Sequence, residues 1–480
     1  MLRTADAAER HGVRRLARLG LLAGLGLLLL SPAPVRAVEK GTVPDVTWGT
    51  SRADVDRTVA AMAEARVRWA RMNVSWSAIE PHDGSYDPAS LADLDYAIAR
   101  VRGAGIDVVM PVADSVPYWA SGDPQKFTDG SGRHWNKRYR PASMADYADF
   151  FGVIAARYAP QGVHVYEVWN EPNLAAFWPS GVNAAEYKEM LEQAYGVIKA
   201  ADPHATVLTG GLSQHDRDFL AQLYAAGARP YFDAVGDHTY PWGDPRKCWS
   251  DGSGRRARDA LCGVEEVRRV MEANGDGAKQ IWITEMGWAT FTGSGGVTDA
   301  QQAAYLSCAY RALEAYPFVR AALQYNFRNT VWRGESGSDY NAHLGLARVD
   351  FSRKPAFEAF RAYVPGAGPC PSGALSPQAK RKTKTKTRLR VIGARKRASA
   401  ARRRATRLRG RVRGARRGRV TIRLERVGRR SARRVLRVKL RRGRFSARVR
   451  VRRGRWRATA SFAGGRKLAP SRSAPRYFRA

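Results

Sequence analysis

Short apolar runs alternate with amphipathic segments from about residue 45 to residue 364. Segments 54–67 and 91–105 carry apolar residues at helical spacing, and the second ends on glycines, as helices often do. The apolar runs predict strands at 69–76, 106–113, 163–170, 205–211, 232–240, 280–288 and 320–327, with an opening strand near 46–50. These runs lack polar alternation, which is typical of parallel strands covered on both faces. Eight strands with intervening helices predict an α/β fold, a (β/α)8 TIM barrel.

The hydrophobic period changes to two in the C-terminal part of the chain. Apolar positions alternate with polar ones, many of them arginine, and the apolar set is Val420, Ile422, Leu424, Phe445, Ala447, Val449, Val451, Trp456, Ala458, Ala460 and Phe462. This pattern predicts half-buried antiparallel strands in a small all-β, sandwich-like domain. A preceding stretch rich in Pro, Gly, Ser and then Lys is typical of a linker. We therefore expect a barrel at 38–366, a linker at 367–386 and a β-sandwich at 387–480.

The first 37 residues have the pattern of a signal peptide. Four arginines between residues 10 and 18 precede an apolar stretch at 19–30, and Val35 and Ala37 occupy the −3 and −1 positions of a cleavage site. Twelve largely apolar residues are few for a bilayer span, so the pattern favours export, with an uncleaved signal anchor as the alternative.

The distribution of charge separates the two domains further, and the cysteines predict disulfides. The net charge is +39, and beyond residue 370 there are 42 Lys and Arg residues against one acid, Glu425, so the preceding part is nearly neutral. The four cysteines are Cys248, Cys262, Cys308 and Cys370. An even number in an exported chain favours disulfides, for example 248–262 with 308–370, although three pairings are possible. Their spacing does not suggest zinc, and we expect no metal and no cofactor.

Two predicted strands end in glutamate. The stretch VYEVWNEPN, residues 165–173, stops on Asn170, Glu171 and Pro172, and the seventh strand reaches Glu285 in ITEMGW. A glutamate followed by proline is a poor structural choice at a strand end. Functional residues of a TIM barrel lie at the carboxyl ends of its strands, and paired carboxylates are what cleavage of a glycosidic bond requires.

With these motifs, residues 45–364 resemble the clan A glycoside hydrolases, family 39 first and family 5 next. The resemblance implies retaining hydrolysis of O-glycosidic bonds, with Glu171 as acid/base and Glu285 as nucleophile. It further implies supporting roles at matching positions: Asn170 bonding the sugar 2-hydroxyl, Tyr240 orienting the nucleophile, His238 beside it and Arg71 keeping the nucleophile ionised. A structural role remains open for His238 and for Arg71.

The sugar platform departs from the clan pattern, in which a tryptophan ends the eighth strand. Here the segment reads LQYNFRNTVW, residues 323–332, so Tyr325, Phe327 or Trp332 are the candidates. Trp119, after the third strand, is a further candidate for stacking on sugar. Glu80 precedes a proline in a loop and is expected to be structural, and the sequence assigns no role to Glu167.

The leading hypothesis is a secreted retaining glycosidase that acts as a monomer on a poly- or oligosaccharide. The alternatives are an inactive carbohydrate-binding barrel and a polyanion-binding surface protein led by the basic tail. That tail resembles bacterial immunoglobulin-like repeats and is expected to bind an anionic cell-wall polymer or an acidic polysaccharide, unless it is merely solvated. Few aromatic residues accompany its arginines, so we expect no specific nucleic-acid partner.

Overall fold

The computed structural model describes residues 37–366, 370, 386–392, 403–463 and 471–479, except 48, 114, 125–135, 242, 251–255, 292, 294, 331–339, 414, 416, 428–432 and 453. The predicted signal peptide and most of the predicted linker therefore lie outside the described residues, as does Trp332.

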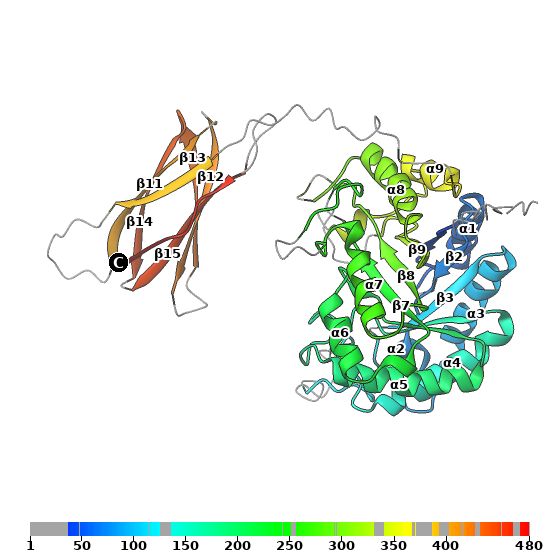
Figure 1. The fold of residues 1–480 in the computed structure, drawn as a ribbon. Coiled ribbons are helices and arrows are strands. Elements are labelled where there is room, and N and C mark those ends of the chain that lie inside the picture. Colours follow the sequence, from blue (N-terminus) through cyan, green and yellow to red (C-terminus); the bar gives the residue numbers. More distant parts are fainter. Residues whose placement is uncertain are drawn as a thin grey trace, which may run out of the picture.

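The N-terminal domain is a closed ring of parallel strands surrounded by helices (Figure 1). Its strands are β1 Glu39–Val43, β2 Trp69–Arg71, β3 Asp107–Val112, β4 Val165–Val168, β5 Thr206–Thr209, β7 Ala234–Thr239, β8 Gln280–Met286 and β9 Val319–Tyr325, with the short β6 Leu212–Ser213 beside β7. The ring closes because β5 pairs with β7 while β1 pairs with both β2 and β9. The predicted TIM barrel is confirmed.

Helices follow the strands and cover the outside of the ring. They are α1 Arg52–Glu64, α2 Trp76–Ile79, α3 Pro88–Gly103, α4 Met144–Tyr158, α5 Ala184–Ala201, α6 Arg217–Ala225, α7 Val264–Ala273, α8 Asp299–Leu313 and α9 Pro355–Ala362. Several begin at a capping side chain: Asp87, for example, accepts a hydrogen bond from the Ser90 N–H at the start of α3. Among the helices that the structure describes, none has the length and apolar content needed to cross a bilayer.

The opening strand is not where its apolar pattern suggested. The prediction near 46–50 is wrong, because β1 is the more polar segment Glu39–Val43. The two charged residues that begin it have partners in the fold: Glu39 accepts a hydrogen bond from the Trp69 indole, and the Lys40 ammonium donates to the Phe360 carbonyl at 2.7 Å, in α9. Gly41 is needed for close strand packing, since a Cβ there would lie 2.6 Å from the Trp69 carbonyl oxygen.

The interior of the barrel has an apolar layer at the amino-terminal ends of the strands. It consists of Trp69, Val109, Val165, Leu208, Ala234, Trp282, Ala321 and Leu323. Side chains two residues further along a strand point to the same face. Arg71 therefore follows Trp69 into the interior and Glu167 follows Val165, so polar groups lie directly above the apolar layer, towards the carboxyl ends of the strands.

The four cysteines form two disulfides. Cys248 pairs with Cys262, and Cys308 in α8 pairs with Cys370, with Cα–Cα distances of 5.8 and 5.0 Å. Of the three pairings open at the level of sequence, the structure has the one that ties a short loop and joins the end of the domain to α8.

The C-terminal domain is all-β and antiparallel, as predicted (Figure 1). Its strands are β10 Lys386–Ile392, β11 Arg403–Arg413, β12 Arg417–Arg426, β13 Arg433–Arg441, β14 Arg444–Arg452, β15 Arg455–Phe462, β16 Ser471–Arg472 and β17 Arg476–Arg479. β13 pairs with β14 only at Arg441 and Arg444, where the chain turns. The halves β10–β11–β14 and β13–β12–β15 therefore diverge from this turn, and their inward side chains share one apolar core.

Candidate active site

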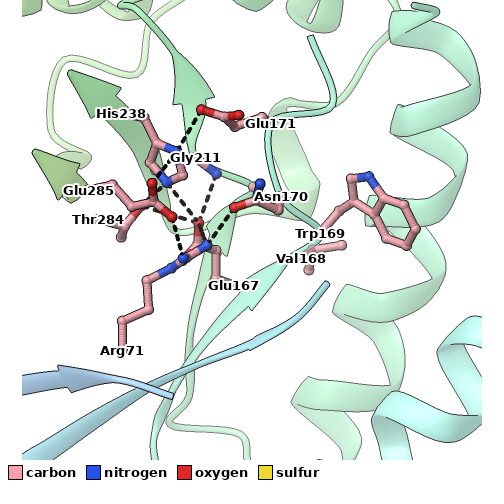
Figure 2. Close-up of polar contacts among 12 residues, drawn as sticks. Arg71, Glu167, Val168, Trp169, Asn170, Glu171, Gly211, His238, Thr284 and Glu285 are labelled. Carbon is pink, nitrogen blue, oxygen red and sulfur yellow. Dashed lines mark hydrogen bonds and ion pairs between the residues drawn. The ribbon is translucent and has the colours of Figure 1, made fainter. Parts of the chain in front are cut away.

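The end of β4 departs from ordinary backbone geometry on both sides of Asn170. Trp169 has a φ of 72° and Glu171 a φ of 44°, and such left-handed conformations cost about 1–3 kcal/mol each outside glycine. They turn the Trp169 indole away from the barrel mouth, where it donates to the Phe177 carbonyl at 3.0 Å, while Asn170 and Glu171 line the mouth (Figure 2). The backbone strain thus accompanies the presentation of an amide and a carboxylate.

Arg71, at the end of β2, forms an ion pair with Glu167 in the interior of the barrel. The Arg71 Nε donates to Glu167 Oε2 at 2.7 Å and its Nη2 donates to Oε1 at 3.2 Å. Glu167 is fully buried and also accepts from the Gly211 N–H at 2.8 Å and the Thr284 hydroxyl at 3.2 Å. Sequence reasoning assigned Glu167 no role, although a glutamate on the inner face of a buried strand requires a buried cation.

The same guanidinium reaches both candidate strand ends. Its Nη1 donates to Glu285 Oε1 at 2.8 Å, and its Nη2 donates to Asn170 Oδ1 at 3.0 Å. Burial alone would lower the pKa of Arg71, but the carboxylates of Glu167 and Glu285 raise it above its ordinary value. Arg71 therefore stays charged and holds three polar side chains from β4 and β8 in one arrangement (Figure 2).

Glu285, in β8, receives a second hydrogen bond from Tyr240. The phenol donates to Glu285 Oε2 at 2.5 Å, opposite the oxygen that faces Arg71. Burial, followed by the nearby Glu285 carboxylate, raises the pKa of Tyr240 well above its ordinary value. The phenol therefore stays protonated near neutral pH and acts only as a donor, so both oxygens of Glu285 are oriented by the protein.

His238, in β7, connects the two strand-end carboxylates. Its Nδ1 lies 3.1 Å from Glu171 Oε1 and 3.6 Å from Glu285 Oε2, and its Nε2 lies 3.1 Å from Thr284 Oγ1. Burial alone would lower the pKa of His238, but the carboxylates of Glu285 and Glu171 outweigh it and raise the pKa above 6.5. Its contacts with the two carboxylates and with the Thr284 oxygen fix the orientation of the buried imidazole.

A cavity of about 600 Å³ lies at the carboxyl ends of the strands, and several of these groups line it. Arg71, Asn170, Glu171, Tyr240 and Glu285 line it, together with Asp45, Asn73, Arg138, Phe177, Tyr325, Asn326, Tyr340 and Asn341 among others. Of the residues predicted from the sequence, the structure thus brings Arg71, Asn170, Glu171, Tyr240 and Glu285 to the cavity, and it places His238 in contact with both glutamates. The cavity lining includes the aromatic residues Phe177, Tyr325 and Tyr340; Phe177 and Tyr340 were not predicted, and Tyr325 was a candidate for the sugar platform.

The other aromatic candidates among the described residues, Trp119 and Phe327, lie elsewhere. Trp119 packs edge-on against Trp76 and donates to the Glu80 carbonyl at 3.0 Å, and it is not among the residues that line the cavity. Phe327 is fully buried and packs on Phe357 of α9. The Glu80 side chain accepts from the Trp76 indole at 2.7 Å, in keeping with a structural role. In the part of the chain that the structure describes, no group of acidic, histidine and cysteine side chains is placed to hold a metal ion.

A parallel (β/α)8 barrel with glutamates at the ends of its fourth and seventh strands, the second of them bonded to a buried arginine, has the architecture of the clan A glycoside hydrolases. Residues 32–336 match the family described as cellulase, glycosyl hydrolase family 5. The chain therefore belongs to glycosyl hydrolase family 5, the second of the two families that its motifs resemble.

The relatives that match parts of this chain are also named as glycosidases. The chain is 32% identical over 149 residues to a probable glucan 1,3-beta-glucosidase A of Aspergillus clavatus, covering 30% of this chain and 34% of that protein. It is 33% identical over 141 residues to a beta-xylosidase of Geobacillus stearothermophilus, covering 27% and 26%. The chain thus spans about a third or less of these relatives. Its fold is similar to that of a family 39 glycoside hydrolase from Bacteroides cellulosilyticus WH2, with a TM-score of 0.54 and 17% identity over 87% of this chain and 81% of that one.

Proposed function

We propose that this protein is a retaining glycoside hydrolase that cleaves β-linked O-glycosidic bonds in a poly- or oligosaccharide. The observation that carries the proposal is the meeting of Glu171 and Glu285 at one His238 nitrogen, beside Arg71 and inside a cavity. Contact with a common nitrogen keeps the two carboxylates close. Such closeness favours the retaining arrangement, about 5–5.5 Å, over the wider inverting one that must admit a water between them. The names of the relatives favour β-linked glucose- or xylose-type sugars.

The hydrogen bonds support different roles for the two carboxylates. Glu285 accepts from a guanidinium and a phenol, which stabilise its negative charge and aim it, as a nucleophile requires. Glu171 has no guanidinium contact among the hydrogen bonds of the described residues, whereas Glu285 has one, so Glu171 is the better proton donor of the two. Glu285 attacks the anomeric carbon while Glu171 protonates the leaving oxygen. Glu171 then removes a proton from the water that hydrolyses the glycosyl–Glu285 ester.

Two further residues of the site are placed to hold the sugar. Asn170 is held by Arg71 with its amide at the mouth of the cavity, where the NH₂ group can donate to the sugar 2-hydroxyl. Tyr325 ends β9 and supplies the aromatic surface that the expected tryptophan would provide.

We place the enzyme outside the cell because its N-terminal pattern is that of a signal peptide and its four cysteines are paired in disulfides.

Product stereochemistry tests the proposal. The purified enzyme is screened on aryl β-D-glucosides, xylosides and mannosides, with α-anomers as controls, and then on the corresponding polysaccharides. Proton NMR of the fastest reaction should show the β-anomer as the first product, before mutarotation mixes the two forms. A first product of α configuration from a β-glycoside would contradict the double-displacement mechanism.

A further inference from the structure

Arginines of the β10–β11–β14 half of the C-terminal domain are gathered on its outer face. β11 alternates strictly there: Leu408 and Val412 are buried, while the arginines on either side of each are exposed. We call the exposed set the arginine face; it consists of Arg388, Arg407, Arg409, Arg411, Arg413, Arg444 and Arg448. All seven therefore project from one surface, since side chains two residues apart share a face of a strand.

The strand register places these charges directly beside one another. Arg411 of β11 lies opposite Arg388 of β10 on one side and opposite Arg444 of β14 on the other, and Arg407 lies opposite Arg448. Neighbouring strands are about 4.8 Å apart, and like charges directly opposite destabilise a sheet. No acidic side chain of the described residues pairs with the arginine face. The domain's one acid, Glu425, is on β12 in the other half, where it accepts from Arg457 at 3.0 Å.

We propose that the arginine face binds a carboxylate-bearing polysaccharide. Guanidinium groups form bidentate hydrogen bonds with carboxylates, and neutralising a polyanion releases its counterions, which favours binding. Rows of arginine that repel one another in the free domain become favourable contacts once a chain of anions lies across them.

Other polyanions fit the face less well. Single-stranded nucleic acid is bound by aromatic stacking together with charge, whereas the exposed Tyr477 is on β17, which pairs with β15 in the other half. An anionic membrane would favour apolar side chains that insert beside the charges, and the arginine face is made of arginines alternating with inward-facing apolar residues. A charged polysaccharide can also be engaged by the barrel, so that binding by one domain raises the local concentration for the other. That last argument rests on the proposed function.

The test compares two triple variants of the full chain with equal loss of charge. One replaces Arg409, Arg411 and Arg448 by Gln on the arginine face. The matched control replaces Arg419, Arg423 and Arg437 by Gln, which are exposed positions of β12 and β13 in the other half. Binding to polygalacturonate is measured at several salt concentrations, with neutral dextran as the blank. This measurement records binding only and does not depend on hydrolysis. Hydrolysis of the best aryl glycoside from the screen is measured separately.

The arginine-face variant should bind at least about tenfold more weakly, and its slope of log affinity against log salt should fall by about two to three, because roughly one counterion is lost per contact. The control should change less than about threefold, and both variants should keep the activity of the wild type. Equal losses in the two variants would overturn the proposal in favour of diffuse charge. Tighter binding of a DNA duplex or polyphosphate at equal charge would also overturn it. If the wild type hydrolysed none of the glycosides, this result would contradict the proposed function and leave the binding proposal untouched.

Discussion

Replacing Glu285 by Ala should reduce turnover by at least about 10⁴-fold for every substrate, because no other group can form the glycosyl-enzyme. Folding should be little affected by comparison, since Glu285 lies at the edge of the cavity and Arg71 keeps its buried partner Glu167. Steady-state kinetics on the best aryl glycoside measures the turnover, and circular dichroism measures the folding of the variant. A matched control is Glu189→Ala, an exposed glutamate of α5, which should retain the activity of the wild type.

Glu171→Ala should behave differently from Glu285→Ala. Substrates whose leaving groups need no protonation should still form the intermediate, so that its hydrolysis becomes limiting. Added azide should then restore turnover and give a β-glycosyl azide, because a small anion can enter the space that the carboxylate vacates. Any azide product of Glu285→Ala should instead have the α configuration, because azide then attacks from the face that the nucleophile vacates. Equal losses in both variants, without rescue in either, would contradict the two assigned roles.

Replacing Glu167 by Gln should destabilise the protein more than any substitution at the cavity surface. It leaves the buried Arg71 charge without its bidentate partner, and breaking a buried ion pair from one side costs about 3–5 kcal/mol. Turnover should fall as well, because Arg71 also positions Glu285 and Asn170. Urea unfolding of the full chain, followed by tryptophan fluorescence of the barrel, gives the change in free energy of unfolding.

The double variant Arg71→Met with Glu167→Gln separates stability from catalysis. Removing both charges should recover much of the lost free energy of unfolding, while turnover should remain low because Glu285 has lost its guanidinium. Recovery of turnover together with stability would show that the pair serves folding alone. A single Glu167→Gln variant as stable as the wild type would contradict the burial argument.

The fold could be predicted because its apolar periods are strong. The runs before Glu171 and Glu285 are buried on both faces, and the period of two in β12, β14 and β15 agrees with their inward residues. The residue patterns at the strand ends likewise pointed to the groups that meet in the cavity. Each of these features is local in sequence and is therefore visible without tertiary contacts.

The missed features depend on contacts between distant segments. β1 carries a glutamate and a lysine whose partners come from β2 and from α9, so its polarity concealed a strand. Glu167 makes sense only once β2 brings Arg71 across the barrel, 96 residues away in sequence. The aromatic lining residues Phe177, Tyr325 and Tyr340 come from separate segments of the chain, which no local pattern unites.

The central claim is that Glu285 becomes covalently bonded to the sugar, and trapping tests it most directly. The enzyme is incubated with 2-deoxy-2-fluoro glycosides that carry an activated leaving group and whose sugars match the best substrates. The fluorine slows both steps by destabilising their oxocarbenium-like transition states, while the leaving group keeps the first step fast, so the intermediate accumulates. Peptide mass spectrometry should find one added fluorosugar, on the peptide that contains Glu285, and Glu285→Ala should not be labelled. Label on Glu171, or rapid turnover with no label on any residue, would contradict the account.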